Sequence, residues 1–119
     1  MTRTALAVLA LVLFAAPAAA QNANKWGAIA FGAPDRKAGT AVDYASADEA
    51  RQAALEACGG QCPRTIVFLR NCAAVAQTQA GAAASAIDRW RGRARSRAVA
   101  ACARSGPGCE ITAWACTAH

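Results

Sequence analysis

The chain has 119 residues, a formal net charge of +6 at pH 7 and six cysteines, and 55% of its residues are hydrophobic. Much of that hydrophobic fraction is alanine, which buries little surface at roughly 25 cal/mol per Å². The length therefore accommodates one domain, and the composition excludes a domain held together by hydrophobic burial alone.

Residues 1–20 are typical of a secretion signal. Arg3 supplies the positive start, a short apolar segment follows, and three alanines form a cleavage site. We expect cleavage between Ala20 and Gln21, which leaves residues 21–119 as a single mature domain. The apolar segment is too short for a membrane span, and no cysteine at the cleavage site offers a lipid anchor. We therefore expect an exported protein, periplasmic or secreted, with no membrane span after processing.

The next stretch predicts a hairpin. Residues 25–31, KWGAIAF, carry apolar side chains at both parities of a strand, which indicates cover on both faces. We expect Trp26, and Trp114 in a later strand, to belong to the core. Residues 32–39, GAPDRKAG, are rich in turn formers. Thr40 to Tyr44 is then the returning strand.

A helix and a buried strand follow the hairpin. Ser46 is the predicted N-cap, with Glu49 three residues later in the pattern of a capping box. Gly59 and Gly60 end the helix. The apolar run from Thr65 to Leu69 has the composition of a strand covered on both sides.

The same pattern restarts near Cys72. CAAVAQ replaces WGAIAF, a second helix repeats the first 44 positions later, and residues 110–116 replace the last strand. Each half, about 24–70 and 71–117, reads strand, strand, helix, strand. We predict an α+β domain of two ββαβ repeats related by a pseudo-twofold axis, with one sheet that carries both helices.

Six cysteines in a small exported domain predict three disulfides, each worth about 2 to 4 kcal/mol. The repeat favours one pairing and leaves a second open. The preferred pairs are Cys58 with Cys62, Cys102 with Cys109, and Cys72 with Cys116. The rival pairing joins Cys58 to Cys102 and Cys62 to Cys109.

A zinc site is the competing interpretation of the last cysteines. Cys109, Cys116 and His119 have a spacing that zinc could use, but export favours disulfides over a metal. We therefore predict no metal and no cofactor. With every cysteine paired no thiolate is left for catalysis, and a histidine at the chain end is a poor base.

The motifs together resemble a bacterial family. WGAIAF at the mature start, A-x-x-x-A-L-x-x-C at 50–58, a glycine-rich turn to a second cysteine and N-C-A-A-V-A at 71–76 are similar to domain of unknown function 4189. The resemblance covers Trp26 to Cys116. It implies a small secreted or periplasmic domain with paired cysteines, and it brings no established activity, substrate or catalytic residue.

Asp43 and Asp88 form the single enzyme-like pair in the sequence. They occupy matching places in the two halves, and two carboxylates are what acid-assisted glycosidic hydrolysis requires. Both also lie shortly before a helix and beside basic side chains, so salt-bridged or solvated aspartates are the ordinary alternative.

The second helix is unusually basic. Residues 88–104, DRWRGRARSRAVAACAR, contain six arginines, and basic residues at a helix start are unfavourable for the helix dipole. The opposing interpretation is an ordinary exposed helix face. Guanidinium groups suit carboxylates and phosphates, and an aromatic ring can stack on a sugar. The candidate binding residues are Trp90, Arg91, Arg93, Arg95 and Arg97.

These patterns favour a non-catalytic binding module that contacts an anionic envelope polymer or an acidic protein partner through this helix. Nucleic acid is disfavoured, because an exported protein meets it rarely. The alternatives are a small glycan-acting hydrolase that uses Asp43 and Asp88, and a purely structural envelope module. The sequence does not predict an oligomeric state.

Overall fold

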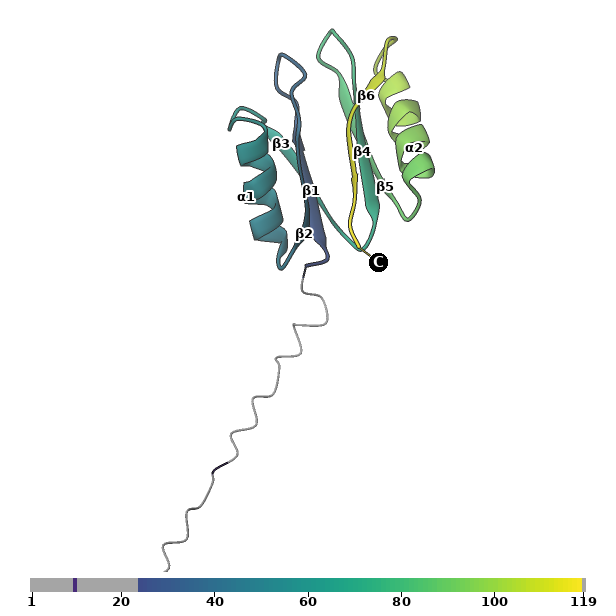
Figure 1. Cartoon of the computed structure of the whole chain (residues 1–119). Coiled ribbons are helices and arrows are strands. Elements are labelled where there is room, and N and C mark those ends of the chain that lie inside the picture. The colour runs from purple at the N-terminus through teal and green to yellow at the C-terminus, as the bar shows by residue number, and fades with distance from the viewer. Residues whose placement is uncertain (1–9, 11–23, 119) are drawn as a thin grey trace, which may run out of the picture.

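The computed structural model describes residue 10 and residues 24–118. Apart from residue 10, the predicted signal peptide, its cleavage site at Ala20 and Gln21, and His119 lie outside the described residues. Eight elements follow one another along the chain (Figure 1). They are β1 (Trp26–Phe31), β2 (Gly39–Tyr44), α1 (Ala47–Ala57), β3 (Arg64–Leu69), β4 (Cys72–Gln77), β5 (Ala83–Asp88), α2 (Arg91–Ala103) and β6 (Glu110–Cys116).

The strands form two antiparallel sheets, ordered β2-β1-β3 and β5-β4-β6. The prediction of one sheet is therefore wrong. A single sheet with both helices on one face would leave the other face of β1 uncovered, although Ile29 and Phe31 on that face are fully buried. Stacking a second sheet there buries them. The element order in each half is ββαβ and the strand orders correspond, while the pseudo-twofold relation between the halves stays a prediction.

The layers run helix, sheet, sheet, helix (Figure 1). Successive side chains of β1 point to opposite faces of its sheet. Ala28 and Ala30 pack against α1, and Ile29 and Phe31 face the other sheet. The bulky side chains thus lie between the sheets, and alanines fill both helix–sheet interfaces. The central cluster consists of Ile29, Phe31, Phe68, Ala73, Val75 and Ala115.

The two helices begin differently. The hydroxyl of Ser46 accepts a hydrogen bond from the amide of Glu49 at 3.2 Å, so the predicted N-cap of α1 is present. α2 begins after Trp90, whose side chain makes no cap hydrogen bond, and its first turn contains no acidic residue. In the described part of the chain, neither helix is long and apolar enough to cross a membrane.

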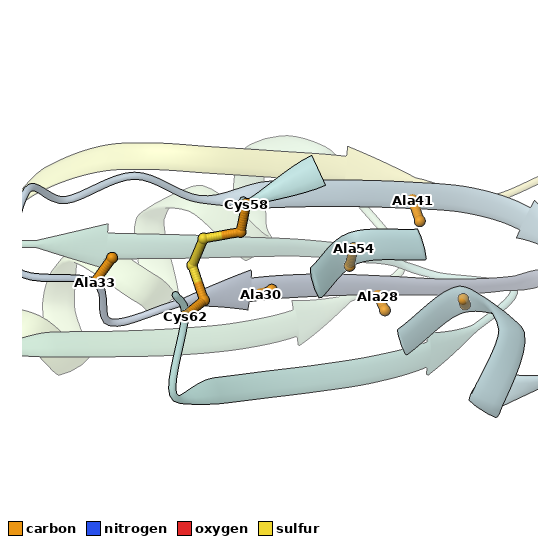
Figure 2. Close-up of a cluster of buried hydrophobic side chains, with 8 residues drawn as sticks. Ala28, Ala30, Ala33, Ala41, Ala54, Cys58 and Cys62 are labelled. Carbon is orange, nitrogen blue, oxygen red and sulfur yellow. A yellow bond between two sulfur atoms is a disulfide. The ribbon is translucent and has the colours of Figure 1, made fainter. Parts of the chain in front are cut away.

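Three disulfides staple the fold, and they join the pairs that the repeat favours. The Cys58–Cys62 bond closes the turn between α1 and β3, beside the alanines under the helix (Figure 2). The Cys102–Cys109 bond closes the corresponding turn after α2. The third disulfide, Cys72–Cys116, joins directly paired residues of β4 and β6 with their Cα atoms 4.0 Å apart.

Candidate binding surface on the second helix

The buried side of α2 determines which of its residues point outward. Ala94, Ala98 and Cys102 are completely buried against β4, at helical spacing. All four candidate arginines of the helix are consequently exposed, and α2 contains no acidic residue that could neutralise them. The outer layer of this half of the domain is therefore positively charged.

Two of these arginines are held by neighbours. The guanidinium of Arg91 lies 4.9 Å from the ring centroid of Trp114, a cation–π contact. Arg97 donates to the carboxylate of Asp88 at 3.2 Å and to the carbonyl of Ile87 at 3.1 Å. The four candidate arginines are thus not equivalent, because Arg97 has a carboxylate partner.

Arg93 and Arg95 are the available cations. Within residues 24–118, neither makes a hydrogen bond or an ion pair with another side chain. Arg95 lines two shallow hollows, one apolar and of about 600 Å³, the other polar and of about 470 Å³. The apolar hollow is lined by Val99, Ala100, Ala103 and Ile111 among others, and the polar one by Thr40, Thr112 and Trp114 among others.

The structure corrects the expectation that Trp114 belongs to the core. Its side chain is 42% exposed, whereas Trp26 is half-buried against the cluster under α1. β6 is an edge strand, and Trp114 pairs with Ala74 on the side of the sheet that carries α2. The indole therefore lies beside the start of the helix. The pattern of β6 did not reveal this, because an edge position cannot be read from local sequence.

Trp90 is also exposed, at 56%, and Arg89 lies over its ring at 5.2 Å from the centroid. Two indoles thus lie near the start of α2, Trp90 at its N-cap and Trp114 on β6, and each is in contact with a guanidinium. Sequence reasoning found Trp90 and the arginines but missed Trp114, Val99 and Ile111. An apolar residue at an outward position of α2, such as Val99, was the available signal.

Comparison with known proteins identifies the family of this chain. The family model of a domain of unknown function (DUF4189) matches residues 26–116. The chain belongs to this family. A solved structure that resembles this DUF4189 domain is the NMR structure of Rv1813c from Mycobacterium tuberculosis, with 27% sequence identity and a TM-score of 0.59. The match covers 98% of this chain and 94% of that chain. No curated protein matches.

The two aspartates of this DUF4189 domain have different surroundings. Asp43 lies on the edge strand β2 and accepts a hydrogen bond from the amide of Ala118 at 2.9 Å. Asp88 ends β5, an edge of the other sheet, and accepts from the amide of Trp90 at 3.0 Å and from Arg97. The described residues contain no hydrogen bond that links the two carboxylates. Each carboxylate instead anchors a nearby backbone amide.

The pKa of Asp88 is lowered, first by the Trp90 amide that donates to its carboxylate and then by Arg97 and the charge of Arg93, against an opposing effect of burial. A general acid for glycosidic hydrolysis needs a raised pKa instead. The described DUF4189 residues also contain no group of three histidine, cysteine or acidic side chains positioned to hold a metal.

The Asp88 environment predicts a pH dependence of stability. Because its folded pKa lies below the unfolded value of about 3.9, the stabilisation is present above that pH and is lost as the pH falls through the folded pKa. We expect the difference in unfolding midpoint between the wild type and Asp88→Asn to shrink from about pH 5 to pH 2. Thermal unfolding followed by circular dichroism measures it. A difference that does not change with pH would contradict this assignment.

Proposed function

We propose that this DUF4189 domain is exported and serves as a non-catalytic binding module, whose α2 surface contacts an anionic partner. The observation that carries the proposal is Arg95, which makes no ion pair within residues 24–118 and lines both an apolar hollow and the polar hollow that includes the exposed indole of Trp114. Arg93 is exposed on the same helix and also makes no ion pair within those residues. Arginine and tryptophan are the residues that most often dominate binding energy at interfaces. The partner chemistry is that of a carboxylate- or phosphate-bearing macromolecule.

The start of α2 supports a role in contact rather than in stability. The N-terminus of a helix carries a partial positive charge, so arginines in the first turn destabilise the helix slightly. α2 has Arg91 and Arg93 there, its first turn contains no acidic residue, and Trp90 gives no side-chain cap. The carboxylate beside this end, Asp88, is already bound by the Trp90 amide and by Arg97. A partner that brings negative charge to this turn would relieve the repulsion and interact favourably with the helix dipole.

The compartment and the repeat belong to the same proposal. Three disulfides and no free cysteine in the described chain suit an oxidising compartment, which supports export to the periplasm or the medium. The matching strand orders support the inference that the two ββαβ halves are copies of one unit related by a pseudo-twofold axis.

Binding to poly-L-glutamate tests the α2 surface. We expect the double variant Arg93→Gln/Arg95→Gln to bind this polyanion about tenfold more weakly than the wild type, because two surface contacts of roughly 0.7 kcal/mol each are lost. Wild-type binding should also weaken as salt is raised from about 20 to 500 mM, where the Debye length becomes short. Fluorescence anisotropy of a labelled polymer, with the protein in excess, measures both effects.

A variant with the same change in net charge is the control. Lys37→Gln/Arg51→Gln removes two cations from the other half, each of which has a carboxylate neighbour there. We expect its affinity for poly-L-glutamate to stay within about twofold of the wild type, a difference of 0.4 kcal/mol or less. Equal losses in the two double variants would refute the proposed surface, because net charge alone would then explain the binding.

A further inference from the structure

The two outer helices carry opposite charge. α1 has three acidic residues and one arginine, and α2 has four arginines and no acidic residue. The helices form the outermost layers on opposite sides of the two sheets (Figure 1). The domain thus presents a negative face at one end of its layer stack and a positive face at the other.

The α1 face also has the shape of a binding surface. A shallow hollow of about 440 Å³ lies on it, with Tyr44 and Ala53 as its apolar part. Tyr44 is 38% exposed. Three carboxylates surround the hollow: Asp48 pairs with Arg51 at 2.7 Å, whereas Glu49 and Glu56 make no ion pair within residues 24–118. Glu49 and Glu56 on α1 are thus opposite in charge to Arg93 and Arg95 on α2, and of these two arginines Arg95 borders the apolar hollow of α2.

We propose that the α1 face of one molecule docks on the α2 face of a second copy of this chain. This inference rests on the proposed function, and it names the anionic partner as the acidic helix of another molecule. On both faces an apolar hollow is bordered by charge, so contact removes apolar surface from water while opposite charges meet. Contacts between two α1 faces or two α2 faces oppose like charges, which disfavours a symmetric pair through either face.

The geometry determines the form of the assembly. Because the two complementary faces lie on opposite sides of one molecule, each contact leaves one free face of each kind at the ends, and the contact is heterologous. A stable interface buries about 800 Å² per partner, whereas one helix of 11 or 13 residues offers less. The expected assembly is therefore a weak, head-to-tail chain of molecules that lengthens with protein concentration and shortens with salt.

Two variants that each lose one face make the test specific. Residues 21–119 contain every described strand, helix and disulfide, and this protein is used throughout. Arg93→Gln/Arg95→Gln keeps only the α1 face, and Glu49→Gln/Glu56→Gln keeps only the α2 face. All four positions are exposed, so both variants should fold, which circular dichroism checks.

Sedimentation velocity at about 20 mM salt, where the Debye length exceeds 20 Å, gives the readout. We expect the weight-average mass of the wild type to rise at least twofold between about 10 µM and 1 mM. This concentration range corresponds to the dissociation constants of weak contacts. Each variant alone should stay monomeric. An equimolar mixture should form a dimer that grows no further, because the two remaining faces pair and each end has lost the two charges that the contact uses.

The outcomes separate this inference from the function on which it rests. A wild type that stays monomeric at 1 mM overturns self-association, and so does a mixture that behaves like its separate components. If that monomeric wild type still binds poly-L-glutamate through Arg93 and Arg95, the proposed function stands alone. If the arginine variant loses no polyanion binding, the proposed function fails whatever the sedimentation shows.

Discussion

The double substitution Cys72→Ala/Cys116→Ala is expected to lower the free energy of unfolding by about 4 kcal/mol. The bond joins residues 44 positions apart, so it removes more disorder from the unfolded chain than either of the other two bonds, which span 4 and 7 positions. It also ties the central strand β4 to its neighbour β6 at a directly paired position. Urea unfolding under oxidising conditions, followed by tryptophan fluorescence, measures the loss.

The Cys58–Cys62 bond provides the control. Cys58, Cys62 and Cys72 are buried and Cys116 is half-buried, so alanine at Cys58 and Cys62 removes at least as much buried sulfur as alanine at Cys72 and Cys116. On loop length alone we expect Cys58→Ala/Cys62→Ala to cost about 2 kcal/mol, half as much. If both double variants lost the same stability, the entropy of the unfolded chain would not be the reason for the effect, and packing at the two sites would have to explain it.

Gly39→Ala is expected to cost about 3 kcal/mol, at the upper end of the range for overpacked cores. A Cβ atom at Gly39 would overlap the carbonyl oxygen of Ala54 and the backbone amide of Cys58. Backbone cannot yield as a side-chain end can, so α1 would have to move away from β2. That movement would open the alanine interface that holds the helix on its sheet. Thermal unfolding and urea titration of the single variant measure the loss.

Gly92→Ala is the matched substitution in the second half. A Cβ atom at Gly92 meets nothing within 4 Å, and the residue lies inside α2. Alanine there should raise the free energy of unfolding by about 0.5 to 1 kcal/mol, because glycine loses more backbone freedom in a helix. Destabilisation at both glycines would show that the close approach of α1 to β2 is not what makes Gly39 necessary.

The sequence predicted the elements well, because their signals are local. The apolar run of β1, at both parities of the strand, and the N-cap at Ser46 each depend on neighbouring residues alone. The number of sheets was wrong because pairing between distant strands decides it. Covering both faces of β1 was expected, yet the pattern of β1 does not say whether a helix or a sheet provides the second cover.

The candidate surface was predicted in part for the same reason. The arginines of α2 follow from helical spacing, but the pairing of Arg97 with Asp88 depends on how β5 ends beside the helix. The stacking of Arg91 on Trp114 joins residues 23 positions apart, through an edge strand. The sequence therefore identified the charge of the surface, and the fold determined which charges are available.

Each disulfide lies within one half of the domain, and none in the described chain crosses between the two sheets. The covalent path from one half to the other is the main chain through Arg70 and Asn71, whose amides donate to Lys25 and Thr117. Under mechanical load, the molecule therefore consists of two disulfide-bonded halves joined by a short connection. A pulling force would separate the two halves along the apolar interface between the sheets while every disulfide stayed intact. The separation of the halves would therefore precede the unfolding of either half.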